Sequence, residues 1–178
     1  MGYQIKDNII SKNYQDYIEE TFTEDFPWYH QLQEQEDWEE DWRSSNFIHM
    51  IHVENEDWQP PLQKTQRYKD IVYPILLEAL DSPLKQVHRI RAVMSINGQV
   101  SEKGFPPHID LSHPHLTMLY YVNDSDGATK IFEEESVVEI EPKKGRVLFL
   151  SGDTLHCGSC PIESDKRILI NFNFLLWN

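Results

Sequence analysis

The sequence predicts a mainly β protein with helices in its N-terminal part, folded as a two-sheet jelly roll or barrel. Residues 86–176 contain eight short runs in which apolar and polar side chains alternate, as they do in half-buried strands. Turn signals such as Asn97-Gly98 and Asp124 to Gly127 separate these runs. Residues 1–85 instead carry two stretches in which apolar residues recur at helical spacing. Helices that come first and strands that follow make the fold class α+β.

The length of the chain predicts one domain, and the distribution of its charges separates an acidic N-terminal layer from the core. At 178 residues it is long enough to bury a core as one domain, residues 1–178. Within it we expect residues 1–85 to form an acidic, Trp-rich helical accessory layer and residues 86–178 to form the core. The formal net charge is −14, and residues 1–60 hold 15 acidic and 3 basic side chains. This negative layer favours a neutral or basic substrate.

Composition excludes several classes of function. The chain lacks the basic patches that follow a phosphate backbone, so nucleic acid is not expected as a partner. No run reaches membrane-spanning length, and the first ten residues lack the apolar core of a signal peptide. Cys157 and Cys160 are too few for a disulfide scaffold, so we expect a reducing, cytoplasmic setting. The oligomeric state cannot be read from the sequence.

The N-terminal part contains two expected helices and one expected strand. Ser11 to Phe22 is amphipathic, with Ser11 near its N-cap, and Gln63 to Leu80 is a second helical stripe that Pro74 kinks or restarts. Between them, Phe47 to Val53 is predicted as a strand. The acidic, Trp-rich segment Asp25 to Trp42 is either a charged loop or helix lying against the main body, or a lid or partner surface beside the site.

The strands begin where the period changes to two. Val87 to Ile96 is the first, with Arg89 and Arg91 on the face opposite His88, Ile90, Ala92, Met94 and Ile96. The further strands are expected at Phe105–Leu111, Leu116–Val122, Thr129–Phe132, Val137–Ile140, Arg146–Leu150, Thr154–Cys157 and Arg167–Leu176.

A metal site is predicted in the middle of this series. His108 and Asp110 are two residues apart, so in an extended strand both side chains point to the same face. His156 is the best candidate for a third ligand. Two histidines and one carboxylate that leave other positions open suit non-haem Fe(II) and oxygen chemistry. His52 and the pair His113 and His115 are weaker candidates, because the first lies in the acidic layer and the pair flanks a proline.

Several segments in order resemble a known family. Residues 86–176 resemble the double-stranded β-helix core, a cupin-like jelly roll, of the Fe(II)/2-oxoglutarate-dependent oxygenases, most closely the prolyl-4-hydroxylase-like branch. The matching segments are His108–Asp110, Leu116–Asn123, Asp126–Phe132, Pro142–Phe149 followed by Asp153–His156, and the strand that Arg167 opens. The resemblance covers about half the chain and says little about residues 1–60.

The resemblance implies a role for each matching residue. His108, Asp110 and His156 would be the catalytic ligands that hold iron. Arg167 would bind the distal carboxylate of 2-oxoglutarate, and Tyr121 would share it. Thr117 lies on the strand face of Tyr121 and Asn171 lies on that of Arg167, which makes both further candidates for cosubstrate contacts. Lys166, one residue before Arg167, would point to the opposite face unless a loop shift exchanged the two.

The function implied by the resemblance is that of a dioxygenase. It would use Fe(II), 2-oxoglutarate and O2 to hydroxylate a C–H bond and release succinate and CO2. Peptidyl proline is the substrate suggested by the family, and the partner is a peptide or a small molecule.

Two alternatives stay open from the sequence. One is a cupin-like metal-binding protein or isomerase that does not use 2-oxoglutarate, against which Arg167 argues. The other is a zinc site made by His156 with Cys157 and Cys160. One feature departs from the family: the end of the first core strand, Met94 to Asn97, has no tyrosine where many relatives have one that touches the cosubstrate.

Overall fold

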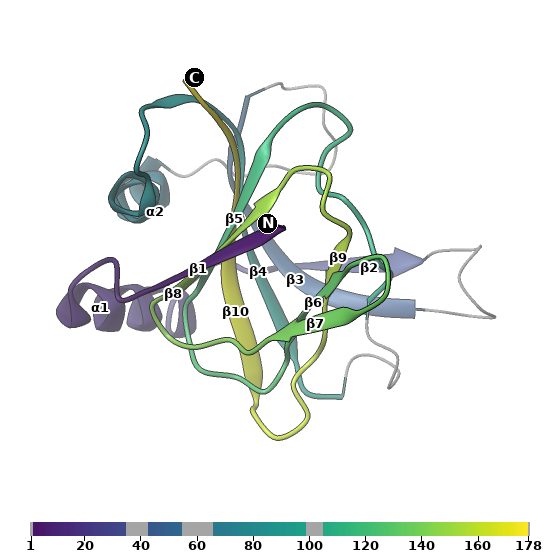
Figure 1. Ribbon diagram of the computed structural model, residues 1–178. Coiled ribbons are helices and arrows are strands. Elements are labelled where there is room, and N and C mark those ends of the chain that lie inside the picture. Colours follow the sequence, from purple (N-terminus) through teal and green to yellow (C-terminus); the bar gives the residue numbers. More distant parts are fainter. Residues whose placement is uncertain (1, 35–42, 55–65, 99–104, 178) are drawn as a thin grey trace.

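Two antiparallel sheets face each other in the computed structural model of the chain, which describes residues 2–34, 43–54, 66–98 and 105–177 (Figure 1). The larger sheet has seven strands in the order β1-β8-β5-β10-β4-β3-β2, and the smaller has three in the order β7-β6-β9. The elements are β1 (Tyr3–Asp7), α1 (Lys12–Thr23), β2 (Tyr29–Glu34), β3 (Arg43–Val53), α2 (Gln66–Ala79), β4 (Leu84–Ile96), β5 (Leu116–Tyr121), β6 (Thr129–Phe132), β7 (Val137–Ile140), β8 (Arg146–Ser151), β9 (His156–Gly158) and β10 (Lys166–Leu176). The predicted fold class, a mainly β jelly roll with helices in its N-terminal part, is confirmed.

Both helices pack on one face of the seven-stranded sheet (Figure 1). In α1 the buried apolar residues are Ile18 and Phe22, and in α2 they include Val72 and Leu76. They meet the side chains of alternate positions along β10 and β5, which are Ile168, Ile170, Phe172, Phe174, Met118 and Tyr120. Strand alternation therefore gives this face to the main hydrophobic core and turns the intervening residues to the other side.

The opposite face of the large sheet looks toward the small sheet. A second core cluster there joins Leu119, Tyr121 and Leu169 of the large sheet to Ile131 and Ile140 of the small one. The odd-numbered residues of β10 from Arg167 to Asn173 also lie on this face, as the sequence predicts. The space between the two sheets therefore receives the polar side chains from which a site can be built.

The N-terminal residues are part of the large sheet. β1 pairs with β8 at one edge, and β3 pairs with β4 toward the other. β1 is absent from the predicted elements, and residues 29–34, expected as loop or helix, form β2 instead. β1 gains its partner from a distant part of the chain, whereas β2 pairs with the next strand, β3. Residues on both sides of the predicted division at 85/86 thus share one sheet.

The predicted helices are confirmed within small shifts of their ends. Ser11 is the N-cap of α1, and its side chain accepts a hydrogen bond from the Tyr14 backbone N–H. α2 runs continuously through Pro74, so the helix does not restart there, which was one of the two predicted outcomes. Burial of the residues on either side, Ile71, Val72, Ile75 and Leu76, offsets the backbone hydrogen bond that the proline cannot make.

One predicted strand is wrong. Phe105–Leu111 is not a strand, and only His108 forms an isolated bridge, with His156 of β9. Pro106 and Pro107 lack backbone N–H groups and cannot join a ladder, which leaves His108 as the residue that pairs. The strand predicted at Thr154–Cys157 begins two residues later, at His156. The other predicted strands from Val87 onward are present with ends shifted by at most three residues.

Trp28 packs against the main body of the protein. This agrees with the first interpretation of the segment Asp25 to Trp42, a charged loop or helix lying against the main body. The Trp28 ring packs against Phe26 at a centroid distance of 4.7 Å, and its Nε1–H donates to the Phe22 carbonyl at 3.3 Å. Trp38 and Trp42 fall outside the described residues. Among the helices that the structure describes, none is long and apolar enough to cross a membrane.

Candidate metal centre and cosubstrate pocket

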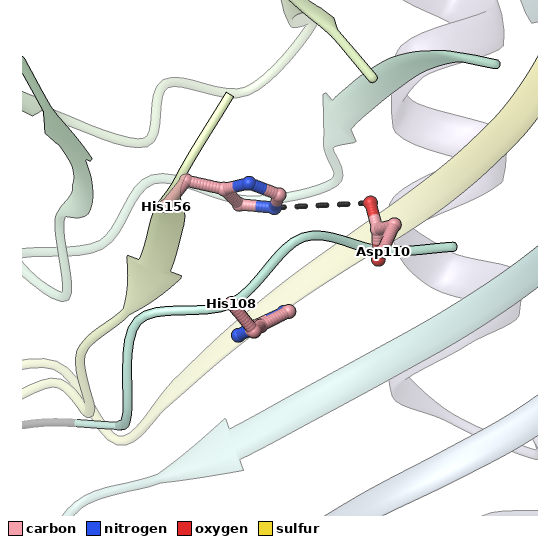
Figure 2. Close-up of side chains that lie close together, drawn as sticks. All are labelled: His108, Asp110 and His156. Carbon is pink, nitrogen blue, oxygen red and sulfur yellow. Dashed lines mark ion pairs between the residues drawn. The ribbon is translucent and has the colours of Figure 1, made fainter. Parts of the chain in front are cut away.

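Three predicted ligands converge between the sheets (Figure 2). His108 and Asp110 come from the segment between β4 and β5, and His156 is the first residue of β9. One ligand atom from each side chain lies within 4.8 Å of those of the other two. His156 Nε2 is 3.7 Å from Asp110 Oδ2. The bridge between His108 and His156 fixes this meeting, because the backbone N–H of each residue donates to the carbonyl of the other.

Backbone carbonyls orient both imidazole rings. The Nδ1 of His108 lies 3.1 Å from the carbonyl of Pro106, and the Nδ1 of His156 lies 2.9 Å from that of Thr154. In each ring Nδ1 then carries the proton and Nε2 keeps a lone pair for a metal. Burial of the His108 ring lowers its pKa, although the residue is partly open to solvent at the cavity mouth. This shift favours the neutral, metal-binding form.

Asp110 is held by a dense set of donors. Its side chain is 1% exposed, and its Oδ1 accepts a hydrogen bond from Arg89 Nη2 at 2.7 Å. Its Oδ2 accepts from Thr117 Oγ1 at 2.9 Å, and the side-chain amides of Asn171 and Asn173 donate to the carboxylate at 3.1 Å. Burial alone would raise the pKa of Asp110, but the charges of Arg89 and Arg91, together with these hydrogen bonds, hold it well below its ordinary value.

This donor set fits Fe(II). Two imidazole nitrogens and one ionised carboxylate lie within 4.8 Å of one another and line the cavity, and this is the ligand set of the facial arrangement in non-haem iron enzymes. The zinc alternative has no such support. Cys157 follows His156 on a strand, so their side chains point to opposite faces, and Cys157 and Cys160 pack with Phe105. Among the described residues neither cysteine joins a cluster of metal-ligating groups, and the cytoplasmic setting inferred from the cysteines stays a prediction.

A cavity of about 530 Å³ connects the three ligands to Arg167. Arg167 of β10 lies opposite Ser95 of β4 in the sheet. Ser95 is four residues along β4 from Arg91, and the Arg91 side chain lies beside Asp110. Four residues of strand span about 13 Å, so Arg167 and the ligands lie at opposite ends of the cavity. The described lining residues are Gln31, Asn46, Ile48, Arg89, Arg91, Val93, Ser95, Phe105, Pro106, Pro107, His108, Asp110, Leu119, Thr129, His156, Gly158, Arg167, Leu169 and Asn171.

Arg167 offers a buried cation at the closed end of this cavity. The residue is 3% exposed, and its Nη2 donates to Thr129 Oγ1 at 2.8 Å. The Tyr121 hydroxyl lies 2.7 Å from the same Thr129 oxygen, and burial raises the pKa of Tyr121, which keeps its proton. The Nε of Arg167 has no hydrogen-bond partner in the described part of the chain. A buried donor without a partner is costly, so this end of the cavity fits a carboxylate such as that of 2-oxoglutarate.

The other predicted cosubstrate residues lie in two places. Tyr121 reaches the cavity through Thr129, whereas Thr117 and Asn171 contact Asp110 at the metal end. Lys166 does not line the cavity, which agrees with its predicted orientation. Within the segment Met94 to Asn97, which lacks the tyrosine of many relatives, Ser95 lines the pocket and donates a hydrogen bond to Asn46 Oδ1 at 3.1 Å.

Sequence reasoning missed several residues of the site. It assigned no role to Thr129 or Asn173, and it did not predict that Arg89 pairs with Asp110 at the metal end. Alternation along β10 could have indicated Asn173, which shares a face with Asn171. Thr129 and Arg89 contact the site across strands, and no local pattern reveals such contacts.

The remaining histidines have other neighbours. His52 Nε2 lies 3.1 Å from the Val87 carbonyl, and His115 Nδ1 lies 2.8 Å from the His113 carbonyl. The ring of His113 stacks edge-on against His88 at 4.7 Å. Neither His113 nor His115 belongs to the described lining of the cavity.

Comparison with known proteins gives one family. The model of the 2OG-Fe(II) oxygenase superfamily matches residues 92–175, a range that contains His108, Asp110, His156 and Arg167. A comparison with curated protein sequences found no significant match.

Solved structures with this fold are similar over nearly the whole chain. A prolyl hydroxylase from Trichoplax adhaerens, in complex with a hypoxia inducible factor oxygen degradation domain peptide fragment, is 13% identical with a TM-score of 0.63, covering 97% of this chain and 83% of its own. A prolyl-4-hydroxylase from Pseudomonas putida is 15% identical with a TM-score of 0.59, covering 99% and 93%. The epimerase SnoN in complex with Fe3+, alpha ketoglutarate and nogalamycin RO is 13% identical with a TM-score of 0.61, covering 98% and 78%. At these identities the likeness shows a common fold.

Proposed function

Because this chain belongs to the 2OG-Fe(II) oxygenase superfamily, and is thus an Fe(II)- and 2-oxoglutarate-dependent dioxygenase that uses O2, we propose that it hydroxylates a C–H bond at the site formed by His108, Asp110 and His156. Each turnover consumes one 2-oxoglutarate and one O2 and yields succinate, CO2 and the hydroxylated product. One oxygen atom thus enters succinate and the other enters the product. The observation that carries the proposal is the placement of three ligands and a buried arginine at opposite ends of one cavity. The cupin-like alternative without 2-oxoglutarate is set aside because the family uses this cosubstrate.

The metal end is built to hold Fe(II) without rearrangement of its ligands. His108 and His156 each keep one ring nitrogen on a backbone carbonyl and present the other to the metal. Asp110 stays ionised because Arg89 pairs with it. Fe(II), when bound with 2-oxoglutarate and O2, supplies the oxidising power that the side chains of the protein lack.

The closed end orients the cosubstrate. The guanidinium of Arg167 pairs with the distal carboxylate of 2-oxoglutarate through donors that Thr129 leaves free. Tyr121 supports Thr129 from behind. Leu119, Val93 and Leu169 form the apolar wall between the two ends and exclude water from the chain of the cosubstrate.

Peptidyl proline is the substrate class that the family suggests, since two of the similar structures are prolyl hydroxylases and one of them holds a peptide. The cavity is also large enough for a small-molecule substrate, because its volume of about 530 Å³ lies within the usual range for small-molecule pockets.

An anaerobic titration tests the proposed function. Metal-free protein receives Fe(II) and then 2-oxoglutarate, and the weak visible charge-transfer band of the iron–2-oxoglutarate chelate is recorded. We expect the band in the wild type and in His30→Ala, a control at an exposed histidine, and no band in His108→Ala or Asp110→Ala. No band in the wild type, with tightly retained zinc instead, would overturn the proposal. Once the band is established, succinate release in the presence of proline-containing peptides tests the substrate class.

A further inference from the structure

The charge of the cavity differs from that of the chain. The formal net charge of the protein is −14, yet the described lining of the cavity contains three arginines, Arg89, Arg91 and Arg167, and a single carboxylate, Asp110. Fe(II) and the doubly charged 2-oxoglutarate cancel each other when both bind. The described lining of the loaded cavity therefore keeps two surplus positive charges in a partly desolvated space, where an unmatched charge is costly.

Two of the three arginines already have a partner. Arg89 makes a direct 2.7 Å hydrogen bond to Asp110, and Arg167 faces the position of the distal carboxylate of 2-oxoglutarate. Arg91 differs from both. Its Nη2 is 3.7 Å from Asp110 Oδ1, beyond hydrogen-bonding distance, and its Nε is buried with no hydrogen-bond partner among the described residues.

Arg91 acts on Asp110 through its charge and makes no hydrogen bond to it. The carboxylate already accepts hydrogen bonds from Arg89, Thr117 and two asparagine amides. The side chain of Arg91 is 17% exposed and lines the cavity, so a molecule that enters can reach its guanidinium. Because Arg91 lies about 13 Å along the strand from the position that faces Arg167, the two guanidinium groups serve different anions.

We propose that the substrate carries a carboxylate that pairs with Arg91 beside the metal. This inference rests on the proposed function and narrows its substrate class, from any peptide or small molecule to one with an anionic group near the carbon that is oxidised. The planar fork of an arginine binds a carboxylate through two parallel hydrogen bonds, which would satisfy the buried Nε. The charges inside the cavity thus argue against the neutral or basic substrate predicted from the acidic N-terminal layer.

A paired ligand set tests the proposal without turnover. Protein loaded with Zn(II) and 2-oxoglutarate is mixed with N-acetyl amino acids and, separately, with the matching N-acetyl amino amides, and binding is measured by ligand-observed NMR. We expect several acids to bind at least tenfold more tightly than their amides. The preference should disappear in Arg91→Met, persist in part in Arg91→Lys, and remain in Arg146→Met, which removes an arginine that pairs with Asp7 on the surface.

Two results would overturn the proposal. One is the absence of any acid preference in the wild type, whether both members of each pair bind or neither does. The other is a preference that survives in Arg91→Met. The Fe(II) chelate band is titrated with 2-oxoglutarate in the same variant. A loss of cosubstrate binding there would assign Arg91 to 2-oxoglutarate, and would refute the inference while the proposed function stands.

Discussion

Arg89 and Asp110 form a buried ion pair at the proposed metal site, with Arg89 Nη2 at 2.7 Å from Asp110 Oδ1 and side chains that are 7% and 1% exposed. Burial lowers the pKa of Arg89 to about 10, so it remains charged at neutral pH. The pKa of Asp110 stays below its ordinary value despite burial. The pair therefore keeps the carboxylate ionised and in position before a metal arrives.

Arg89→Met should destabilise the metal-free protein by about 3 kcal/mol, because it removes the hydrogen-bonded counter-charge of a buried carboxylate. Urea denaturation of the metal-free protein measures this loss. Arg146→Met is the matched control, since Arg146 pairs with Asp7 at a more exposed position, where a salt bridge contributes about 1 kcal/mol or less. Equal losses of unfolding free energy in the two variants would show that the buried pair contributes no more to stability than the more exposed pair.

Asp126 should make the protein sensitive to acid. Its carboxylate accepts hydrogen bonds from the backbone N–H groups of Ile162, Glu163 and Ser164, and these hold the pKa of Asp126 below its ordinary value although burial opposes them. The contribution is present above the unfolded pKa of about 3.9 and is lost as pH falls through the lower folded pKa. Unfolding midpoints measured from pH 5 to pH 2 should fall less steeply in Asp126→Asn than in the wild type. Asp165→Asn, the same change of charge in the loop that holds these three backbone donors, should keep the wild-type slope; identical slopes in all three would contradict the assignment.

Local patterns were sufficient to predict the strands that carry the site. β6 and β7 have the predicted ends, and alternation along β10 correctly puts Arg167 and Asn171 on one face. Thr129–Phe132 and Val137–Ile140 are bounded by turn residues, which fix their ends in the sequence itself.

Other parts of the fold depend on contacts that no local pattern shows. β1 has few buried residues, and its partner β8 is about 140 residues away, so its pairing is set by the rest of the sheet. His108 and Asp110 were assigned to a strand that does not exist, yet they meet His156 because one bridge at His108 is enough to align the segment. The role of Thr129 likewise comes from its position beside both Tyr121 and Arg167.

Gly158→Ala should weaken 2-oxoglutarate binding without loss of the metal site. A Cβ at this position would lie 3.2 Å from Arg167 Nη1, so the guanidinium would have to move by a few tenths of an ångström. We expect the dissociation constant for 2-oxoglutarate, read from the chelate band, to rise several-fold, with Fe(II) affinity unchanged. Gly127→Ala offers a contrast, because its Cβ would lie 2.7 Å from the backbone oxygen of Ser159, which cannot give way as easily. Gly127→Ala should therefore lower the free energy of unfolding as well. Wild-type stability in Gly127→Ala would contradict the steric argument.

Arg167→Met should raise the 2-oxoglutarate requirement most. Removing one partner of a buried, hydrogen-bonded charge pair costs at least about 2 kcal/mol, which corresponds to a dissociation constant about 30-fold higher. Lys166→Met is the matched control, because this neighbouring cation does not line the cavity and should leave the constant within about twofold of the wild-type value. Thermal unfolding of both metal-free variants separates a binding defect from misfolding, and Fe(II) binding without 2-oxoglutarate checks that the ligands remain in place. Wild-type cosubstrate affinity in a folded Arg167→Met protein would remove Arg167 from the cosubstrate site. A shift confined to Lys166→Met would transfer the role to the neighbouring residue.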